Sequence, residues 1–481
     1  MTPRARAVRP RRSGNEHTAG RRLIIVVAVL AVVVGVALIE QAVGQPSSPV
    51  APPEPSAATI ATAAASSSSW FCAGGTTGFG AQANTTIYVT NTGTSTVAGA
   101  VSTSVNPNTG KPSVSSRQTI SVPAHGTVAV NPGLQAPGGY GASTLTFAGG
   151  GIGVSQVAGG PDGWSTAPCA SVSSANWYFA SGATTAGNQL ILALYNPTST
   201  EAVANVSFDT DAGVLQPQPY QGLSVPPGQV VIENVGDYVQ NRPRVATTVS
   251  AQSGQIVADQ LHLVSTAGAS GLSLALGAPT VHGQWYFGQT TNPSAAGSSV
   301  SFMLSNPGAN AEKAVIAVGL AQGSVAPITV PVPAKSVVPF TASTTNRIPH
   351  QVPYSVSISS TGGSGLVVAR EVTAPTGAPL PAFGTMLGTA QAEEHWLVPA
   401  PGAGSAPAVQ GGSVGSVAVS NPGSVTAQVT VAPLGGTAAQ AKVLMVKPHS
   451  LLVLAQAPVG GLVTLDVRSN VPVVVEEDSV P

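Results

Sequence analysis

The sequence predicts an all-β chain in which four tandem immunoglobulin-like β-sandwich repeats follow a single N-terminal transmembrane helix and a disordered linker. Three observations carry this prediction. Tryptophan-led blocks recur at a nearly constant interval, and short apolar runs alternate at period two between turn residues. In addition, 55 glycines and 41 prolines among 481 residues leave little room for long helices in the body of the chain.

Residues 1–22 form a basic tail that we expect to be cytoplasmic. This segment holds seven arginines and one acid, so the rest of the chain carries 11 basic and 17 acidic residues, a net charge of −6. Positively charged residues that flank an apolar span stay on the cytoplasmic side of a membrane. A mildly acidic body without basic clusters predicts no nucleic-acid partner.

Residues 23–39 are uncharged and strongly apolar, and they are predicted to form a transmembrane helix. A helix of this length spans about 26 Å, against a hydrocarbon core of about 30 Å. This predicts a single-pass protein of the cell membrane with an extracytoplasmic body. The alternative is the core of a signal peptide that is cleaved after Gly44, which would make the protein secreted. The apolar run exceeds the usual signal-peptide length, which favours the anchor.

Residues 40–69 are rich in proline, serine and alanine, with almost no large apolar side chain. Such a segment cannot bury a core, and we expect it to be a disordered linker between the membrane and the folded body.

Four tryptophans open the predicted repeats at intervals of 107, 108 and 111 residues. They are Trp70, Trp177, Trp285 and Trp396. The predicted repeats are residues 70–170, 171–280, 281–390 and 391–481. Each has about seven or eight short strands in roughly 100 residues, which is the size of an immunoglobulin-like sandwich. A propeller is disfavoured, because its blades run about 40 to 50 residues. We expect the tryptophans to fill the cores, with ligand stacking as the alternative.

Two further markers recur in the same order within every repeat. An apolar run ends in asparagine, usually before proline, and we expect a turn there, because asparagine tolerates turn conformations. These asparagines are Asn91, Asn196, Asn306 and Asn421. The closing strand of each repeat then carries a polar pair, to which the sequence alone assigns no role. The pairs are Ser155 and Gln156, Asp259 and Gln260, Arg370 and Glu371, and Glu476 and Glu477.

The two cysteines, Cys72 and Cys169, bracket the first repeat. In an oxidising compartment, two cysteines at opposite ends of one domain predict a disulfide. Free buried thiols are the alternative, and two sulfurs are too few for a zinc site.

No motif predicts catalysis. Gly411 to Gly415 match the G-x-S-x-G elbow, but a strand pattern follows the serine where a helix is required. Residues 106–113 lack the first glycine of a phosphate loop. Asp209, Asp211 and Gly213 resemble half of a calcium loop without its other ligands, and we expect a surface turn. No catalytic or cofactor-binding residue is predicted.

Metal binding is not predicted either. The seven histidines lack the spacing of a zinc motif. They are His17, His125, His262, His282, His350, His395 and His449. Glu393 to His395 form the densest charged cluster of the body, which we interpret as exposed linker. We interpret the acids at 476–478 as a solvated end of the chain.

The basic head, apolar span, Pro/Ser linker and the run W-F-C-A-G-G at 70–75, with the later Trp and Asn-Pro blocks, resemble a family of uncharacterised actinobacterial secreted or membrane-anchored proteins of the unknown-function type. The resemblance covers most of residues 70–481. It implies no activity and no functional residue. Trp396-Leu397 departs from the longer aromatic clusters of the other repeats, which leaves the last boundary least defined.

We therefore expect a non-enzymatic structural or interaction protein of the bacterial cell envelope, whose partners are the membrane and a cell-wall polymer or another envelope protein. One alternative is a glycan-binding or adhesion module, which would need exposed tryptophans. Another is an envelope-polymer hydrolase that draws its carboxylates from separate repeats. The candidates for that role are Asp209, Asp259, Glu371 and Glu394.

Overall fold

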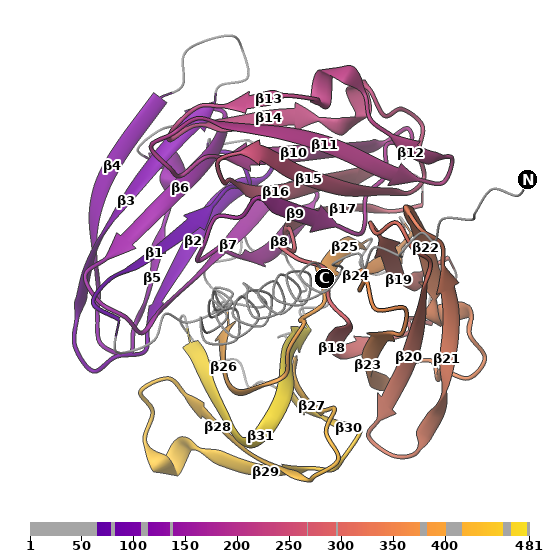
Figure 1. The fold of residues 1–481 in the computed structure, drawn as a ribbon. Coiled ribbons are helices and arrows are strands. Elements are labelled where there is room, and N and C mark those ends of the chain that lie inside the picture. The colour runs from indigo at the N-terminus through magenta and orange to yellow at the C-terminus, as the bar shows by residue number, and fades with distance from the viewer. Residues whose placement is uncertain are drawn as a thin grey trace, which may run out of the picture. The chain divides into compact units, whose positions relative to one another are not determined.

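The structure, a computed structural model, describes residues 65–77, 82–106, 114–134, 138–266, 268–294, 297–375, 382–400, 416–455 and 463–478. These residues belong to one compact unit, residues 55–481. They form 31 strands in seven antiparallel sheets and five single-turn 3-10 helices, with no α-helix in the described ranges (Figure 1). The all-β prediction is confirmed.

The predicted basic tail and transmembrane segment lie outside the described residues. Within the described ranges, no helix is long and apolar enough to cross a membrane. The first described strand, β1, begins at Ser68, within the last two residues of the segment predicted to be linker.

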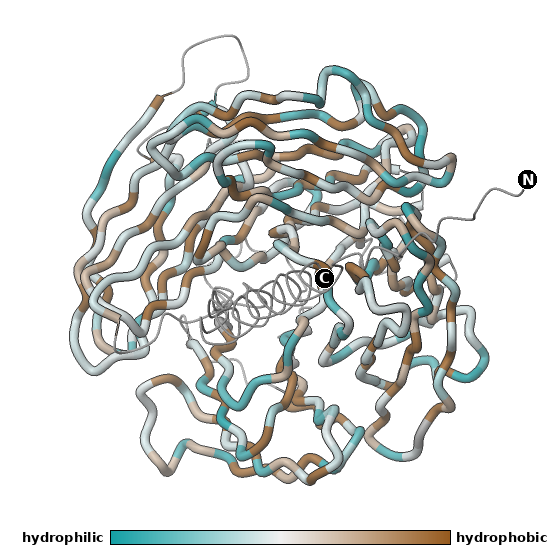
Figure 2. The backbone as a smooth tube through the Cα atoms, in the orientation of Figure 1, coloured by the Kyte–Doolittle hydropathy of each residue, from teal (hydrophilic) through white to brown (hydrophobic). Residues whose placement is uncertain are grey.

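The strands group into four modules that share one strand order. In modules 1 to 3 the first, sixth, third and fourth strands form one sheet, and the fifth, second, seventh and eighth form the other. Module 4 follows the same order, but its long last strand belongs to both parts, so that its described strands form one sheet of six. Each core draws apolar side chains from both sheets, as in a β-sandwich. Hydrophobic and polar residues alternate along many strands (Figure 2), as expected where one face of a strand is buried.

The bounds of the strands follow the recurring markers of the sequence. Module 1 contains β1 (Ser68–Cys72), β2 (Asn84–Asn91), β3 (Val97–Asn106), β4 (Val114–Val122), β5 (Thr127–Val130), η1 (Pro132–Leu134), β6 (Tyr140–Phe147), β7 (Ile152–Gly160) and β8 (Gly163–Pro168). Module 2 contains β9 (Asn176–Phe179), β10 (Asn188–Tyr195), β11 (Ala202–Thr210), β12 (Gly213–Leu215), η2 (Gln218–Tyr220), β13 (Leu223–Val225), β14 (Val230–Asn234), η3 (Val235–Asp237), β15 (Val245–Ser253), β16 (Val257–Ser265) and β17 (Ser270–Leu276). In module 2, β12 and β13 together take the place of the fourth strand, because both pair with β11.

Module 3 repeats the order of module 1. It contains β18 (Gln284–Thr291), β19 (Ser299–Asn306), β20 (Glu312–Leu320), β21 (Ser324–Val332), β22 (Ser336–Thr341), η4 (Ala342–Thr344), β23 (Pro353–Ser360), β24 (Val367–Ala374) and β25 (Ala382–Leu387). Module 4 contains β26 (Glu393–Ala400), β27 (Ser416–Asn421), β28 (Ala427–Pro433), η5 (Ala438–Gln440), β29 (Lys442–Val446), β30 (Ser450–Ala455) and β31 (Val463–Asp478). The long β31 serves as both sixth and seventh strand, since its first part pairs with β26 and β28 and its last part with β27.

The four repeat-opening tryptophans are buried, with exposed fractions of 0, 0, 2 and 8% along the chain. In three modules the indole N–H donates to a backbone carbonyl oxygen. The acceptor is the residue directly before the part of the chain that pairs as the seventh strand. The acceptors are Ile256 for Trp177, Leu366 for Trp285 and Val473 for Trp396, each at 2.8 Å. Trp70 packs in the same core as Cys72 and Cys169. The core position is confirmed, and these side chains are not available to stack on a sugar.

The four asparagines are fully buried, and each forms side-chain hydrogen bonds beyond the turn predicted for it. We call this set of hydrogen bonds the asparagine tie. In each module the side-chain nitrogen donates to the carbonyl four residues later and to the last residue of the fourth strand. The side-chain oxygen accepts the amide two residues later. For Asn196, these distances are 2.7 Å to Thr200, 2.8 Å to Val225 and 2.9 Å from Thr198. The tie joins the end of the second strand to the opposite sheet.

The predicted disulfide joins Cys72 to Cys169 in the structure, linking the end of β1 to the residue after β8. It closes a loop of 97 residues. Replacing both cysteines by serine is expected to lower the free energy of unfolding of module 1 by about 3 kcal/mol, because the unfolded chain gains entropy. Urea denaturation of oxidised wild-type and double-variant protein measures this difference. Equal midpoints would contradict the expectation.

Successive modules meet through the same strands. The fifth strand of one module contacts the third and sixth strands of the module before it, as β14 does with β3 and β6. The pattern recurs for β22 with β11 and β15, and for β30 with β20 and β23. We call these the first, second and third junctions.

Module 4 also contacts module 1, at what we call the fourth junction. Thr127 of the fifth strand β5 lies 3.0 Å from Thr464 of β31, hydroxyl to hydroxyl. A Cβ atom added to Gly435 would lie 2.6 Å from the Cβ of His125, in the turn before β5. At the third junction, Gly319 likewise faces His449, in the turn before β30. The series of contacts therefore returns to its start.

Candidate functional site

At least one member of each unassigned polar pair contacts the neighbouring module. At the first junction, Oδ2 of Asp259 on β16 accepts the backbone N–H of Ala73 at 3.0 Å and the side-chain N–H of Gln156 at 2.5 Å. Asp259 is fully buried, and both of its donors belong to module 1. A Cβ atom on Gly74 would lie 2.3 Å from Cδ1 of Leu274 and 3.1 Å from Oδ2 of Asp259, so a larger residue would require these side chains to move.

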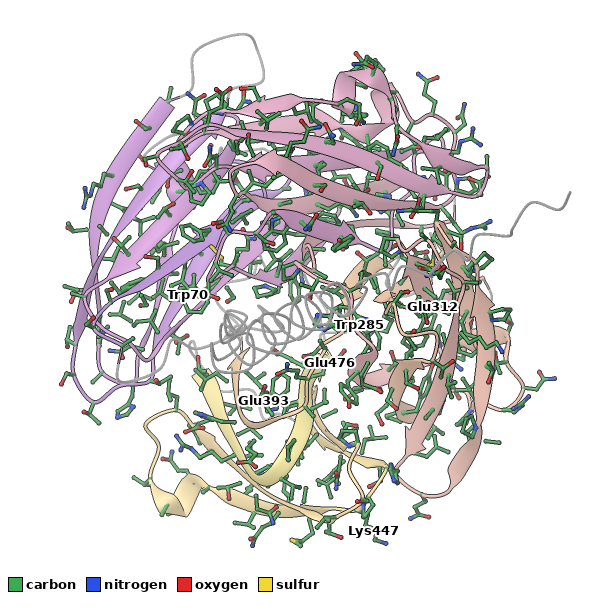
Figure 3. All side chains as sticks on the ribbon, in the orientation of Figure 1. Trp70, Trp285, Glu312, Glu393, Lys447 and Glu476 are labelled. Carbon is green, nitrogen blue, oxygen red and sulfur yellow. A yellow bond between two sulfur atoms is a disulfide. The ribbon has the colours of Figure 1, made fainter. Side chains whose placement is uncertain are left out.

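The third junction repeats this arrangement with a charged donor. Oε2 of Glu476 on β31 accepts the backbone N–H groups of Gly288 at 2.7 Å and Gln289 at 3.2 Å, and its Oε1 lies 2.8 Å from Nη1 of Arg370. Figure 3 labels Glu476 and Trp285. Gly288 stands three residues after Trp285, as Ala73 does after Trp70. We call each carboxylate and its donors a junction clamp.

The two clamps occupy equivalent positions in register. Asp259 pairs with Ala193 and Glu476 with Ala418, each three residues before the buried asparagine of its module. Their side-chain donors are equivalent as well, because Gln156 pairs with Ile87 and Arg370 with Phe302, each four residues before an asparagine. The chain therefore uses one geometry twice, with Gln and Asp at one junction and Arg and Glu at the other.

The second junction has different chemistry. Ala369 stands at the clamp position, and Glu371 instead accepts a hydrogen bond from the Ser181 hydroxyl at 2.8 Å. Ser273 and Thr385 share a hydrogen bond of 2.6 Å between their hydroxyls. The ring of His262 meets Phe383 edge-on at 4.7 Å between centroids.

Burial shifts the pKa values of several ionisable side chains on the seventh strands. Burial raises the pKa of Asp259 to about 7, against the opposing effect of hydrogen bonds from Gln156, Ala73 and Gly74. Burial also raises the pKa of Glu477 to about 7 and that of Glu371 above its ordinary value. Burial lowers the pKa of His262 to about 3, so this imidazole is neutral at physiological pH.

A buried acid with a raised pKa makes folding dependent on pH. The folded state holds the proton of Asp259 more tightly than the unfolded state, so its contribution to stability is complete below about pH 4 and is lost as pH rises towards 7. We expect the wild-type melting temperature to fall between about pH 4 and 8, and to fall less in Asp259→Asn. Melting curves across that range measure the slope, and equal slopes would contradict the role of Asp259.

The predicted half calcium loop is a hairpin. Asp209 lies within β11. Burial raises its pKa to about 6, against the opposing effect of the positive charge of Lys335 in module 3. Asp211 lies in the exposed turn, 3.9 Å from Arg242. Thr210 closes the turn by donating to Gly213 at 2.7 Å. The surface turn is found at 211–213, whereas Asp209 is buried.

The remaining sequence candidates fall in separate places. His395 is exposed and lies 2.7 Å from Asp466, and hydrogen bonds from His395 and Arg468 hold the pKa of Asp466 below its ordinary value despite partial burial. His282 contacts Thr280 at 3.0 Å. Residues 411–415, 107–113 and His17 lie outside the described residues. In the described ranges, no three His, Cys, Asp or Glu side chains group around a metal position.

Glu476 is not part of a solvated terminus, since it is only 9% exposed and clamps the third junction. The four carboxylates considered for hydrolysis have different surroundings. Asp259 and Glu371 serve the first and second junctions, Asp209 faces Lys335, and Glu394 is exposed on β26. The described contacts assemble them into no shared site.

Comparison with known proteins adds one finding. No curated protein matches the chain. Residues 141–280 match DUF5719, a family of unknown function. The matched segment contains β7, all strands of module 2 and therefore Gln156 and Asp259 of the first junction clamp.

Proposed function

We propose that the chain is a non-enzymatic, membrane-anchored extracytoplasmic protein of the bacterial cell envelope, in which four immunoglobulin-like tandem repeats form a structural or interaction body. The observation that carries this proposal is that the buried ionisable side chains of the clamps form contacts between modules. Asp259, Glu476 and Arg370 hold one module to the next through protein donors and acceptors. These three buried side chains thus serve cohesion between modules.

Two observations support the proposed compartment. The disulfide between Cys72 and Cys169 is of the kind that persists in oxidising compartments. The resemblance to uncharacterised actinobacterial secreted proteins points in the same direction. With 7% charged residues, the body would meet a wall polymer or an envelope protein through mostly uncharged polar side chains.

Topology is tested on the full chain with a C-terminal epitope in intact bacterial cells. External protease is expected to remove the epitope, and the chain is expected to stay in the membrane fraction after a salt wash. A protected epitope would refute an extracytoplasmic body. A mature chain that begins at Gln45 would refute the anchor and establish the secreted alternative.

The interaction role is tested with the detergent-solubilised full chain and purified envelope polymer. Co-sedimentation without release of soluble fragments is expected. Release of fragments that grows with time and protein concentration would refute the non-enzymatic proposal. Heat-unfolded chain serves as the control for nonspecific adsorption.

A further inference from the structure

Module 4 exposes three large apolar side chains around one strand, β29. Val425, Val443 and Met445 have exposed fractions of 60, 58 and 61%. Val443 and Met445 lie two positions apart on β29, so both point to the same side of the sheet. Val425 lies in the loop between β27 and β28, and β28 is the strand that pairs with β29. Apolar surface is therefore concentrated at this part of module 4.

The other three modules carry different residues at the equivalent positions. In every module the fourth strand ends in a buried valine that pairs with the first residue of the third strand, which fixes the equivalence. The position of Met445 is Ser121, Ser224 or Pro331, and that of Val443 is Thr119, Gly222 or Thr329. Val425 stands four residues after the buried asparagine, where the other modules have Ser95, Thr200 or Asn310. The exposed apolar side chains are thus a property of module 4 and not of the repeat.

Basic side chains surround this apolar surface. Lys442 and Lys447 are both exposed, and they flank Val443 and Met445 in the sequence. Arg468 on β31 is 65% exposed and pairs with Thr430 of β28, which in turn pairs with Val443. These are all three basic residues of the segment 391–481. We call Val425, Lys442, Val443, Met445, Lys447 and Arg468 the basic-apolar patch.

The acids of module 4 lie elsewhere, with one exception. Asp466 binds Arg468 at 3.1 Å. Glu393 and Glu394 lie on β26, which β31 and β28 separate from β29. The acids at 476–478 lie on the part of β31 that pairs with β27. In Figure 3, Lys447 lies at one end of module 4, away from the labelled Glu393 and Glu476. With Asp466 offsetting Arg468, the patch keeps the positive charge of its two lysines.

We propose that the basic-apolar patch docks on the surface of a membrane that contains anionic lipids. Val443 and Met445 then reach the apolar boundary below the headgroups, while the ammonium groups of Lys442 and Lys447 contact lipid phosphates. Exposed apolar side chains bordered by lysine and arginine are typical of surfaces that lie in a membrane interface. The chain beyond residue 22 carries 11 basic and 17 acidic residues, so the patch is the side that an anionic surface would select.

This proposal rests on the proposed function, in which an anchor holds the body beside a membrane. A lipid surface suits the patch better than a second copy of the chain does. A twofold contact brings a patch onto itself, and it would set the lysines of one copy against those of the other. An anionic bilayer instead offers opposite charge together with an apolar layer beneath it.

A fluorescent probe at the centre of the patch tests the docking. The full chain carrying Met445→Cys is labelled at that thiol with a polarity-sensitive dye, while the native disulfide stays oxidised. It is incorporated into phosphatidylcholine vesicles, with or without phosphatidylglycerol, that contain nitroxide-labelled lipid. We expect the dye to shift to the blue and to be quenched only when phosphatidylglycerol is present. Ser121→Cys is the matched control, because Ser121 is exposed at the equivalent position of module 1, and it should stay unquenched.

The charge requirement is tested by substitution and by salt. Lys442→Ser with Lys447→Ser is expected to lower the ratio of docked to undocked chain about 25-fold, about fivefold per lysine. Arg117→Ser with Lys313→Ser removes two exposed basic side chains from other modules and should leave the ratio unchanged. Salt at about 1 M, where the Debye length is about 3 Å, should release the patch.

Four results would overturn the proposal: an unquenched dye at residue 445, equal quenching at residue 121, quenching without phosphatidylglycerol, or quenching that survives the loss of both lysines. A blue shift that grows with protein concentration and shows no lipid quenching would identify a second copy as the occupant and refute lipid docking.

Flotation of the same vesicles separates this proposal from the proposed anchor. A chain that floats with neutral vesicles, but whose dye is unquenched in the anionic ones, retains the anchor and lacks the docking. A chain that fails to float with neutral vesicles, but is quenched in the anionic ones, lacks the anchor and retains the docking.

Discussion

Replacing Asn196 by aspartate is expected to lower the free energy of unfolding by about 4 to 5 kcal/mol at about pH 8. The side-chain nitrogen of Asn196 donates to two carbonyls, those of Thr200 and Val225. A carboxylate would point an oxygen at both acceptors, in a position with no solvent exposure. The variant would lose these donors and also bury an uncompensated charge, and these are the costs that produce the largest effects of single substitutions.

The pH dependence of the variant provides a second readout. A carboxyl group in this position is neutral in the folded state up to a higher pH than in the unfolded state. Its penalty should therefore be smallest near pH 4 and grow as pH rises. Asn205→Asp is the matched control, since the Asn205 oxygen only accepts the Gly222 amide at 2.8 Å at a more exposed site. Urea denaturation at two pH values measures both variants, and equal losses would contradict the proposed role of the tie.

Replacing Glu476 by alanine is expected to cost about 3 to 5 kcal/mol, because it removes the carboxylate from the buried Arg370. The variant would also deprive the amides of Gly288 and Gln289 of their acceptor. The loss should appear as separation of module 4 from module 3, with faster hydrogen exchange at both sides of the third junction. Glu393→Ala is the control, since that side chain is exposed on β26.

Arg370→Gln tests whether the two clamps are interchangeable. It would place at the third junction the donor that Gln156 supplies at the first. We expect a smaller loss than in Glu476→Ala, together with a new decrease of stability as pH rises towards 7, because Glu476 would then resemble Asp259. An Arg370→Gln variant as unstable as Glu476→Ala would show that the guanidinium charge is indispensable.

The features that the sequence predicted are those that act within one module. A tryptophan at constant spacing, two cysteines around one repeat and apolar alternation each report a local core, and the structure places Trp177 and the Cys72–Cys169 pair accordingly. The sequence predicts a turn at each of the four asparagines but not their burial. The signal for their burial is that asparagine follows an apolar run at the same place in all four repeats.

The role of the polar pairs could not be read from the sequence in the same way. Contacts such as Gln156 to Asp259 join residues 103 positions apart in different modules. Strand periodicity reports which face of a strand is buried, but not which module covers that face. For the same reason the sequence predicts a solvated end for the acids near the C-terminus, whereas Glu476 bonds to module 3 in the structure.

The alternation of junction chemistry has a consequence for the ancestry of the chain. Modules 1 and 3 supply the donors Gln156 and Arg370, modules 2 and 4 supply the acceptors Asp259 and Glu476, and the second junction between these pairs uses other contacts. Duplication of a two-module ancestor would leave this pattern. A donor module with its acceptor would then be the repeating unit, and a substitution in one half of a clamp would require a matching change in the other half, because each donor faces a buried acceptor.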